Sequence, residues 1–124
     1  MEDMVISGTN KTPTIIFNAQ SGVLEIRGTS IPENPMAFYQ PVIDWVDKYS
    51  EKPRNTIVNI DLEYFNTSSS KILLNIFKAI ARVRQAGCEL EINWYFEEDD
   101  EEAIESGHDF SMFTKVDFNF IARE

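Results

Sequence analysis

The 124-residue sequence predicts a single α/β domain, residues 1–124, in which a mixed five-stranded sheet carries about three helices on one face. Two strand-like segments come first, and helix-like and strand-like segments then alternate along the chain. The later strand-like segments alternate apolar and polar residues, whereas strands buried on both faces read as continuous apolar runs. Helices on one side of the sheet, with a solvated second face, account for that alternation. The 5 glycines form no phosphate-binding or dinucleotide-binding pattern, which disfavours a nucleotide-binding fold.

A hairpin and a helix make up the first part of the domain. Alternating runs at residues 14–19 and 23–28 flank a Gln-Ser-Gly turn, which is the pattern of two antiparallel strands. Asn34 suits a helix N-cap and Pro35 the first helical position, and apolar residues then recur at helical spacing to about Ser50. We therefore expect the first helix to begin at Pro35.

A strand over residues 56–64 and a second helix follow. The predicted core face of this strand carries Val58, Ile60, Leu62 and Tyr64. After a run of polar residues, an apolar stripe at helical spacing extends to about Ala86, and Gly87 ends the helix.

The last third of the chain contains two strands, an acidic run and a weaker helix. We expect strands at residues 88–96 and 116–121, and between them a helix at about residues 101–113 that Gly107 interrupts. The acidic run, residues 97–102, leads into this helix. By parity, the uncovered face of the sheet is acidic, and its carboxylates are Glu25, Asp61, Glu63, Glu89, Glu91 and Asp117.

The charge balance narrows the classes of partner. With 11 Lys and Arg against 21 Asp and Glu, the formal net charge is −10, so phosphate backbones and anionic lipids would repel the protein. This argues against nucleic-acid and membrane binding. The acidic amino terminus lacks a secretory-signal pattern, and no apolar cluster approaches the roughly 20 residues that span a bilayer. We expect a cytoplasmic protein whose single cysteine, Cys88, forms no internal disulfide.

Four consecutive hydroxyl residues, Thr67 to Ser70, stand between a strand and the second helix. One interpretation is capping, in which a Ser or Thr side chain accepts hydrogen bonds from the free amides of the first helical turn. The other is phosphorylation. A phosphate adds about −1.5 to −2 charges beside the positive end of the helix dipole, so it stabilises the helix while changing its surface. One hydroxyl suffices for a cap, and both interpretations stay open.

The solvent-facing side of the second helix is basic. Its polar stripe consists of Lys71, Asn75, Lys78, Arg82 and Gln85. In so acidic a protein this stripe can guide a partner, although solvated helix faces commonly have the same composition. We expect the partner-binding residues among the polar cluster and the stripe. They are Asn66, Ser68, Ser69, Ser70, Lys71, Lys78 and Arg82.

These features resemble a known family. A Thr or Ser at a strand-to-helix junction of a one-sided α/β domain is similar to the STAS domains of anti-sigma-factor antagonists, which phosphorylation switches at that point. The resemblance is closer to the SiaC family of bacterial regulatory phosphoproteins, which have a STAS-like fold. Thr29 and Ile31 depart from the arginine and aromatic residues that the family leads us to expect. The segments that carry the resemblance are residues 12–15, 28–34, 38–39, 64–71 and 94–100.

The resemblance implies a regulatory mechanism. It places the phosphoacceptor at Thr67, with Ser68 as the second choice, and implies a GHKL-type Ser/Thr kinase opposed by a PPM-type phosphatase. In the family, the unphosphorylated protein binds and activates a diguanylate cyclase, which raises cyclic di-GMP and favours biofilm formation. The STAS resemblance leaves open an anti-sigma-factor antagonist, whose partner would be an anti-sigma kinase.

Enzyme and metal sites have weaker support. The acidic run offers carboxylates for Ca²⁺ or Mg²⁺ but lacks the spacing and central glycine of a calcium loop, so we expect a solvated loop. His108 and Cys88 have no positioned catalytic partner in the sequence. A small hydrolase built on the serine cluster, with Glu33, Asp61 or His108 as base, would lack the glycine-flanked nucleophile elbow. We therefore expect a non-enzymatic protein without a cofactor.

Overall fold

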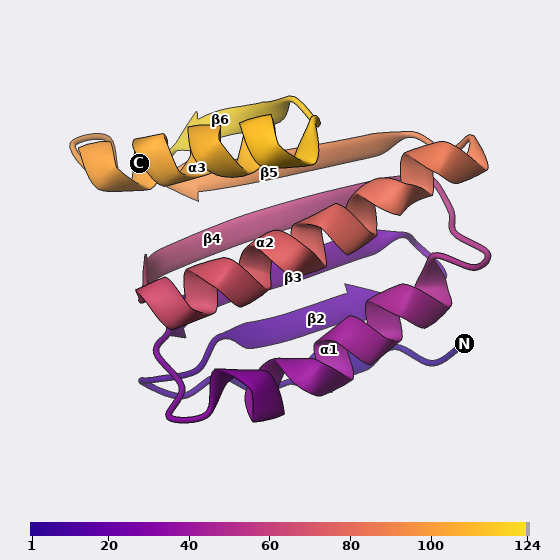
Figure 1. Ribbon diagram of the computed structural model, residues 1–124, viewed down its shortest axis with the longest axis horizontal. Coiled ribbons are helices and arrows are strands. Elements are labelled where there is room, and N and C mark those ends of the chain that lie inside the picture. Colours follow the sequence, from indigo (N-terminus) through magenta and orange to yellow (C-terminus); the bar gives the residue numbers. More distant parts are fainter. Residues whose placement is uncertain (124) are drawn as a thin grey trace.

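The computed structural model describes residues 1–123, which form one six-stranded sheet and three α-helices (Figure 1). The strands are β1 (Met4–Ile6), β2 (Thr14–Asn18), β3 (Val23–Ser30), β4 (Thr56–Phe65), β5 (Leu90–Phe96) and β6 (Phe118–Ala122). The helices are α1 (Pro35–Tyr49), α2 (Thr67–Ala81) and α3 (Glu101–Thr114). A 3₁₀ helix, η1 (Arg82–Ala86), continues α2 as far as Gly87.

Strand order in the sheet follows the sequence from β1 to β6. β1, β2 and β3 pair antiparallel, whereas β3 to β6 pair parallel. One helix joins each parallel pair, and right-handed crossovers that advance in one direction place every helix on the same face. Figure 1 shows α1, α2 and α3 side by side over one face of the sheet, all beginning at the edge where the parallel strands end. The predicted α/β domain with helices on one face is confirmed.

The predicted count of five strands is wrong by one, because β1 is a sixth strand at the edge of the sheet. Its 3 residues are too few to give a periodic signal in the sequence. Met4 pairs with Phe17 of β2, and the indole Nε1 of Trp45 donates a hydrogen bond to the carbonyl of Glu2 at 2.8 Å. Tertiary contacts rather than local propensity therefore hold this strand.

The core lies between the helices and the covered face of the sheet. The inward-facing side chains of the strands and the apolar stripes of the helices form this core, as the sequence predicts. Asn34 caps α1 by accepting a hydrogen bond from the amide of Ala37 at 3.2 Å, and Pro35 is the first helical residue, as expected. The largest fully buried side chains are Trp94, Tyr39, Phe17, Phe77, Ile15, Leu24, Ile26, Ile60, Leu73, Ile76, Ile80 and Ile92.

A β-bulge near the end of β4 corrects the prediction for Tyr64. Gly28 of β3 pairs with Leu62, but the next residue pairs with Tyr64, so Glu63 is the extra residue. The bulge reverses the parity beyond this point, and Tyr64 is 58% exposed instead of buried. Phe65 takes the inward position, with its ring centroid 6.1 Å from that of Trp94.

Gly107 does not interrupt α3, which is continuous, so that prediction is wrong. The glycine is buried because α3 lies close to β5 and β6 at this point. A Cβ atom there would lie 2.6 Å from the ring of Phe120 and 2.7 Å from Nε1 of Trp94. Close packing, rather than a break in the helix, accounts for the glycine.

The uncovered face of the sheet carries acidic side chains, as predicted, and also several exposed apolar ones. Asp61 and Glu25 are half-buried, whereas the other four predicted carboxylates, Glu63, Glu89, Glu91 and Asp117, are exposed. Three asparagines form a ladder across β4, β5 and β6, because the Asn93 side chain donates to Asn59 at 2.9 Å and accepts from Asn119 at 3.0 Å. Within residues 1–123, no helix has the length and apolarity needed to cross a bilayer.

Candidate functional site

Thr67 lies at the first position of α2, just beyond the carboxyl end of β4, and its side chain is exposed. The N-cap is Asn66, whose side-chain oxygen accepts a hydrogen bond from the amide of Ser69 at 2.9 Å. The prediction that a Ser or Thr provides the cap is therefore wrong. Among the hydrogen bonds of residues 1–123, none involves the hydroxyl of Thr67 or Ser68. The exposed hydroxyls are thus available for chemistry that leaves the cap intact.

The third hydroxyl of the cluster has a different role. The sequence predicts Ser69 among the partner-binding residues, but it is fully buried and so does not belong to an exposed binding surface. Its Oγ donates to the carbonyl of Ser30 at 3.0 Å and accepts from the Ser30 hydroxyl at 2.9 Å. The Ser30 hydroxyl also lies 2.6 Å from the Tyr39 hydroxyl. We name Ser30, Tyr39 and Ser69 the hydroxyl anchor; it ties the first turn of α2 to β3 and α1.

Burial keeps the phenol of Tyr39, one member of the hydroxyl anchor, protonated. It raises the pKa of the Tyr39 phenol to about 12, although the hydrogen bond with Ser30 lowers that pKa. The phenol therefore keeps its proton at neutral pH and can donate to Ser30. The carbonyl of Ser30 also accepts a hydrogen bond from the amide of Asn66 at 3.2 Å, next to the phosphoacceptor candidate. Three hydrogen bonds with Ser30 of β3, two made by Ser69 and one by Asn66, thus hold the start of α2 that carries Thr67.

The structure divides the predicted basic stripe. Lys71 and Lys78 are exposed on α2, and Ser70 is half-buried near its start. Arg82 lies in η1, where it forms an ion pair with Asp47 of α1 and donates to the carbonyl of Ala79. Arg82 thus has a partner within the domain, although 44% of its side chain stays exposed. The two lysines remain as the cations of α2 that a partner can meet directly.

The acidic run lies at the same edge of the sheet as Thr67, and its last two residues, Glu101 and Glu102, form the start of α3 (Figure 1). Asp100 caps α3 by accepting from the amide of Ala103 at 3.0 Å, and Glu97 pairs with Arg123 at 3.3 Å. Within residues 1–123, no group of three or more His, Cys, Asp or Glu side chains could hold a metal ion. The expected solvated loop is therefore limited to residues 97–99, since Asp100 caps α3 and the last two acidic residues belong to its first turn.

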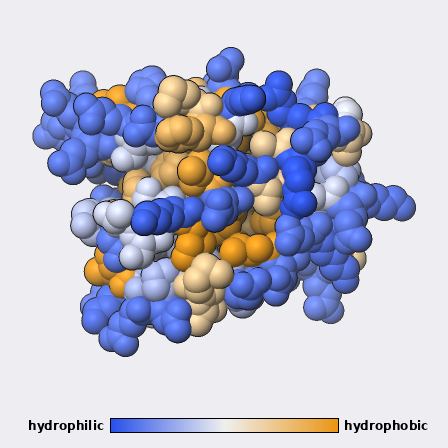
Figure 2. All heavy atoms as spheres, viewed as in Figure 1, coloured by the Kyte–Doolittle hydropathy of each residue, from blue (hydrophilic) through white to orange (hydrophobic). Residues whose placement is uncertain are grey.

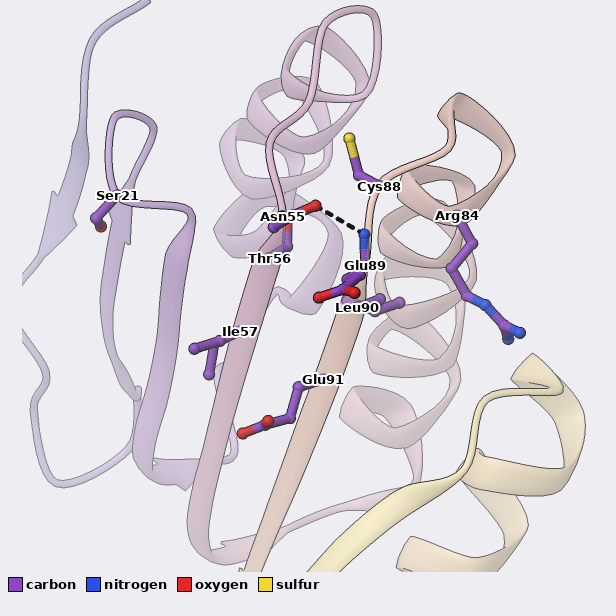
Figure 3. A pocket seen from close by; sticks show the side chains of 9 residues that line it. All are labelled: Ser21, Asn55, Thr56, Ile57, Arg84, Cys88, Glu89, Leu90 and Glu91. Carbon is purple, nitrogen blue, oxygen red and sulfur yellow. Dashed lines mark hydrogen bonds between the residues drawn. The ribbon is translucent and has the colours of Figure 1, made fainter.

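Catalytic groups do not converge at the other reactive side chains. His108 is exposed and its ring centroid lies 4.2 Å from that of Phe120. Cys88 is half-buried at the edge of the sheet opposite Thr67, and its thiol lies 3.5 Å from the carbonyl of Pro53. A cavity of about 740 Å³ adjoins Cys88, and no histidine lines it (Figure 3). Nucleophile and base are not brought together at these positions.

Sequence reasoning missed two of the three residues of the hydroxyl anchor. The Ser30–Ser69 contact joins positions 39 residues apart, and no local pattern reports it. A signal for the cap was available, because Asn66 stands three residues before the Ser69 amide and Asn is among the strongest N-caps. Exposure does not distinguish Thr67 from Ser68 as the phosphoacceptor, because both side chains are exposed.

The fold and this junction define a small one-sided α/β domain that presents an exposed threonine at a helix start. The family model for the SiaC family regulatory phosphoprotein matches residues 6–123. The chain belongs to this family, which consists of regulatory proteins and not enzymes. The match favours SiaC-type regulation over the anti-sigma-factor antagonist that the sequence left open.

Relatives from Pseudomonas aeruginosa agree in sequence and in structure. An uncharacterized protein of strain UCBPP-PA14 is 32% identical over 111 residues, which cover 89% of this chain and 88% of that protein. The crystal structure of apo-SiaC matches with 30% identity, a TM-score of 0.84 and full coverage, 100%, of both chains. The chain also matches a crystal structure of the diguanylate cyclase SiaD in complex with its activator SiaC, with 30% identity and a TM-score of 0.89. That alignment covers 98% of this chain and 100% of the matched one.

Proposed function

We propose that this chain activates a diguanylate cyclase when Thr67 is unphosphorylated, and that phosphorylation of Thr67 ends the activation. A GHKL-type kinase adds the phosphate and a PPM-type phosphatase removes it. The observation that carries the proposal is an exposed Thr67 hydroxyl on a helix start whose cap and anchor are made by other residues, Asn66 and Ser69. A kinase can therefore reach the hydroxyl without unfolding the domain.

The partner class rests on the family and on one homologous complex. SiaC of Pseudomonas aeruginosa is the activator in the crystal structure with the diguanylate cyclase SiaD. Similarity along nearly the whole chain supports the same type of partner here. Activation then raises cyclic di-GMP and favours biofilm formation. Because the kinase and the cyclase consume ATP and GTP, the exchange of partners takes place in the cytoplasm.

The switch acts through charge at the surface of α2. The phosphate contributes about −1.5 to −2 charges at neutral pH. No acidic residue stands in the first turn of α2, so the positive end of the helix dipole accepts that charge. In a complex, the same charge must lose its water at the interface or face carboxylates of the partner. Phosphorylation therefore weakens binding while the helix is retained.

The contact surface around Thr67 includes exposed residues of α2 and of the end of β4. Ser68, Lys71 and Lys78 remain proposed contacts on α2, and Asn66 and Ser70 border them. Tyr64, which the bulge turns outward, adds an exposed aromatic ring at the same edge of the sheet. Exposed aromatic side chains commonly contribute strongly to protein interfaces.

The phosphoacceptor is tested by incubating the protein with its cognate kinase and ATP and mapping the phosphate by peptide mass spectrometry. We expect one phosphate on Thr67, none on the Thr67→Ala variant, and normal phosphorylation of Ser68→Ala. Phosphate on Ser68 alone would transfer the role to the neighbouring hydroxyl. Phosphate outside residues 66–71 would refute the proposed site.

A further inference from the structure

The uncovered face of the sheet carries an apolar strip that the Thr67 site does not use. Val5 pairs with Ile16 across β1 and β2, and Val23 pairs with Ile57 across β3 and β4. Ile16 and Val23 are diagonal neighbours in the register of β2 and β3, about 7–8 Å apart, so the two pairs lie next to each other on this face. Val5 is 68% exposed and Ile57 40%, so the strip presents apolar surface to solvent. We name Val5, Ile16, Val23 and Ile57 the apolar strip.

A groove adjoins the apolar strip at the edge of the sheet where β4 and β5 begin. The cavity of about 740 Å³ described above is lined by Ile57 together with Ser21, Glu89 and Glu91. Figure 3 shows the side chains of Ile57 and Glu91 extending from adjacent strands toward the hairpin that carries Ser21. The groove therefore has an aliphatic side chain and carboxylates along the same wall.

The carboxylates of this groove have no basic partner in the domain. Among the ion pairs of residues 1–123, none includes Glu89 or Glu91, and both side chains are exposed. Glu91 accepts one hydrogen bond from Asn93 at 2.9 Å. Arg84 lines the outer end of the cavity, but its guanidinium donates to the carbonyl of Lys115 at 3.0 Å and extends away from both carboxylates in Figure 3. The groove is consequently lined by negative charge from Glu89 and Glu91 next to the apolar strip.

We propose that the apolar strip and its groove dock a basic amphipathic segment of a partner protein. Apolar side chains of the segment cover Val23 and Ile57, and its Lys or Arg side chains reach Glu89 and Glu91. Charge complementarity selects this occupant. A second copy of the chain, related by a two-fold axis through the strip, would bring these unpaired carboxylates toward their own equivalents. Nucleic acid would be repelled by the same groups.

The docking surface is independent of the phosphorylation site. β4 runs from Thr56 beside the groove to Phe65 beside Thr67, and its 10 residues separate the two sites by about 30 Å at 3.3 Å per residue. This distance exceeds the Debye length of about 8 Å at physiological ionic strength, so the phosphate is screened from the groove. The surface therefore stays competent whether or not Thr67 carries phosphate, and its test does not depend on the proposed switch.

The probe is a fluorescent helical peptide composed of leucine and lysine, and its binding to the full chain is followed by anisotropy. Charge reversal in Glu89→Lys/Glu91→Lys should weaken binding by about tenfold or more. The matched control, Glu98→Lys/Asp99→Lys, makes the same change of net charge in the acidic run and should weaken binding by less than about threefold. Ile57→Thr, which retains the β-branched shape, should weaken binding by about fivefold through loss of apolar contact.

Further measurements make the result decisive. Glu89→Gln/Glu91→Gln guards against misfolding of the charge-reversed protein, and it should also weaken peptide binding. Amide chemical-shift changes should concentrate on β3, β4 and the start of β5. Equal weakening by the two lysine variants, or shift changes confined to the helices, would overturn the proposal. Self-association that the peptide competes away and that Ile57→Thr abolishes would instead identify a second copy as the occupant and overturn it as well.

Discussion

Ser69 and Ser30 are joined by two hydrogen bonds in opposite directions, at 3.0 and 2.9 Å, between the first turn of α2 and the last residue of β3. Both residues are fully buried. A buried hydroxyl that loses its partner incurs a desolvation penalty, so this pair fixes where α2 begins. Thr67 projects into solvent from the helical turn that the pair holds in place.

Removing the hydroxyl of Ser69 tests the anchor. Ser69→Ala leaves the Ser30 hydroxyl and carbonyl short of one partner each, so we expect a loss of about 1–3 kcal/mol in the free energy of unfolding. Urea denaturation followed by circular dichroism measures it. Ser68→Ala is the matched control, because Ser68 is an exposed neighbour and should change stability by less than about 0.5 kcal/mol. Equal stabilities of the two variants would contradict an anchoring role.

The phenol of Tyr39 predicts a loss of stability at high pH. Burial raises its pKa from 10.0 to about 12, so the folded state holds this proton more tightly than the unfolded state. The contribution is fully present below pH 10 and is lost as the pH rises from 10 toward 12. The slope attributable to one such group is at most about 1.4 kcal/mol per pH unit.

The control for the pH effect is Tyr39→Phe, which removes the phenol and keeps the ring. The difference in unfolding free energy between the wild type and this variant should shrink as the pH rises from 10 toward 12. A pH-independent difference would show that the phenol does not titrate with a raised pKa.

Gly107→Ala should destabilise the protein even though alanine favours helices over glycine. The added methyl group would lie 2.6 Å from the ring of Phe120, and neither Phe120 nor Trp94 can move freely in a packed layer. Overpacking of this kind costs about 1–3 kcal/mol. Glu105→Ala, on the same helix and exposed, controls for helix propensity in a thermal melt. An increase in melting temperature for Gly107→Ala would refute the close approach.

The helix order, the one-sided arrangement and the acidic face were predictable because they depend on periodicity over many residues. Glu63 shows where periodicity fails, since one bulged residue reverses the side-chain parity and exposes Tyr64. The hydroxyl run drew attention to the correct junction, but it did not separate exposed Thr67 from buried Ser69. That division depends on Ser30 of β3, which lies far away in the sequence, and on Tyr39 of α1, the helix beside α2.

Substitutions at Thr67 separate charge from shape. Thr67→Glu should reduce activation of the cyclase about tenfold or more relative to Thr67→Ala, because only glutamate brings a negative charge to the interface. Asn66 provides the cap, so Thr67→Ala should change the free energy of unfolding by less than about 0.5 kcal/mol. The production of cyclic di-GMP by the cognate cyclase is the readout. Identical activation by both variants would contradict a charge-based switch.

Isothermal titration of the cognate diguanylate cyclase with this protein tests the regulatory account most directly. Two preparations are compared, one unphosphorylated and one that mass spectrometry shows to be fully phosphorylated on Thr67. We predict that the phosphate weakens the affinity by about tenfold or more, while the thermal melt of the free domain is unchanged or slightly raised. Equal affinities for a fully phosphorylated, folded protein would contradict the account.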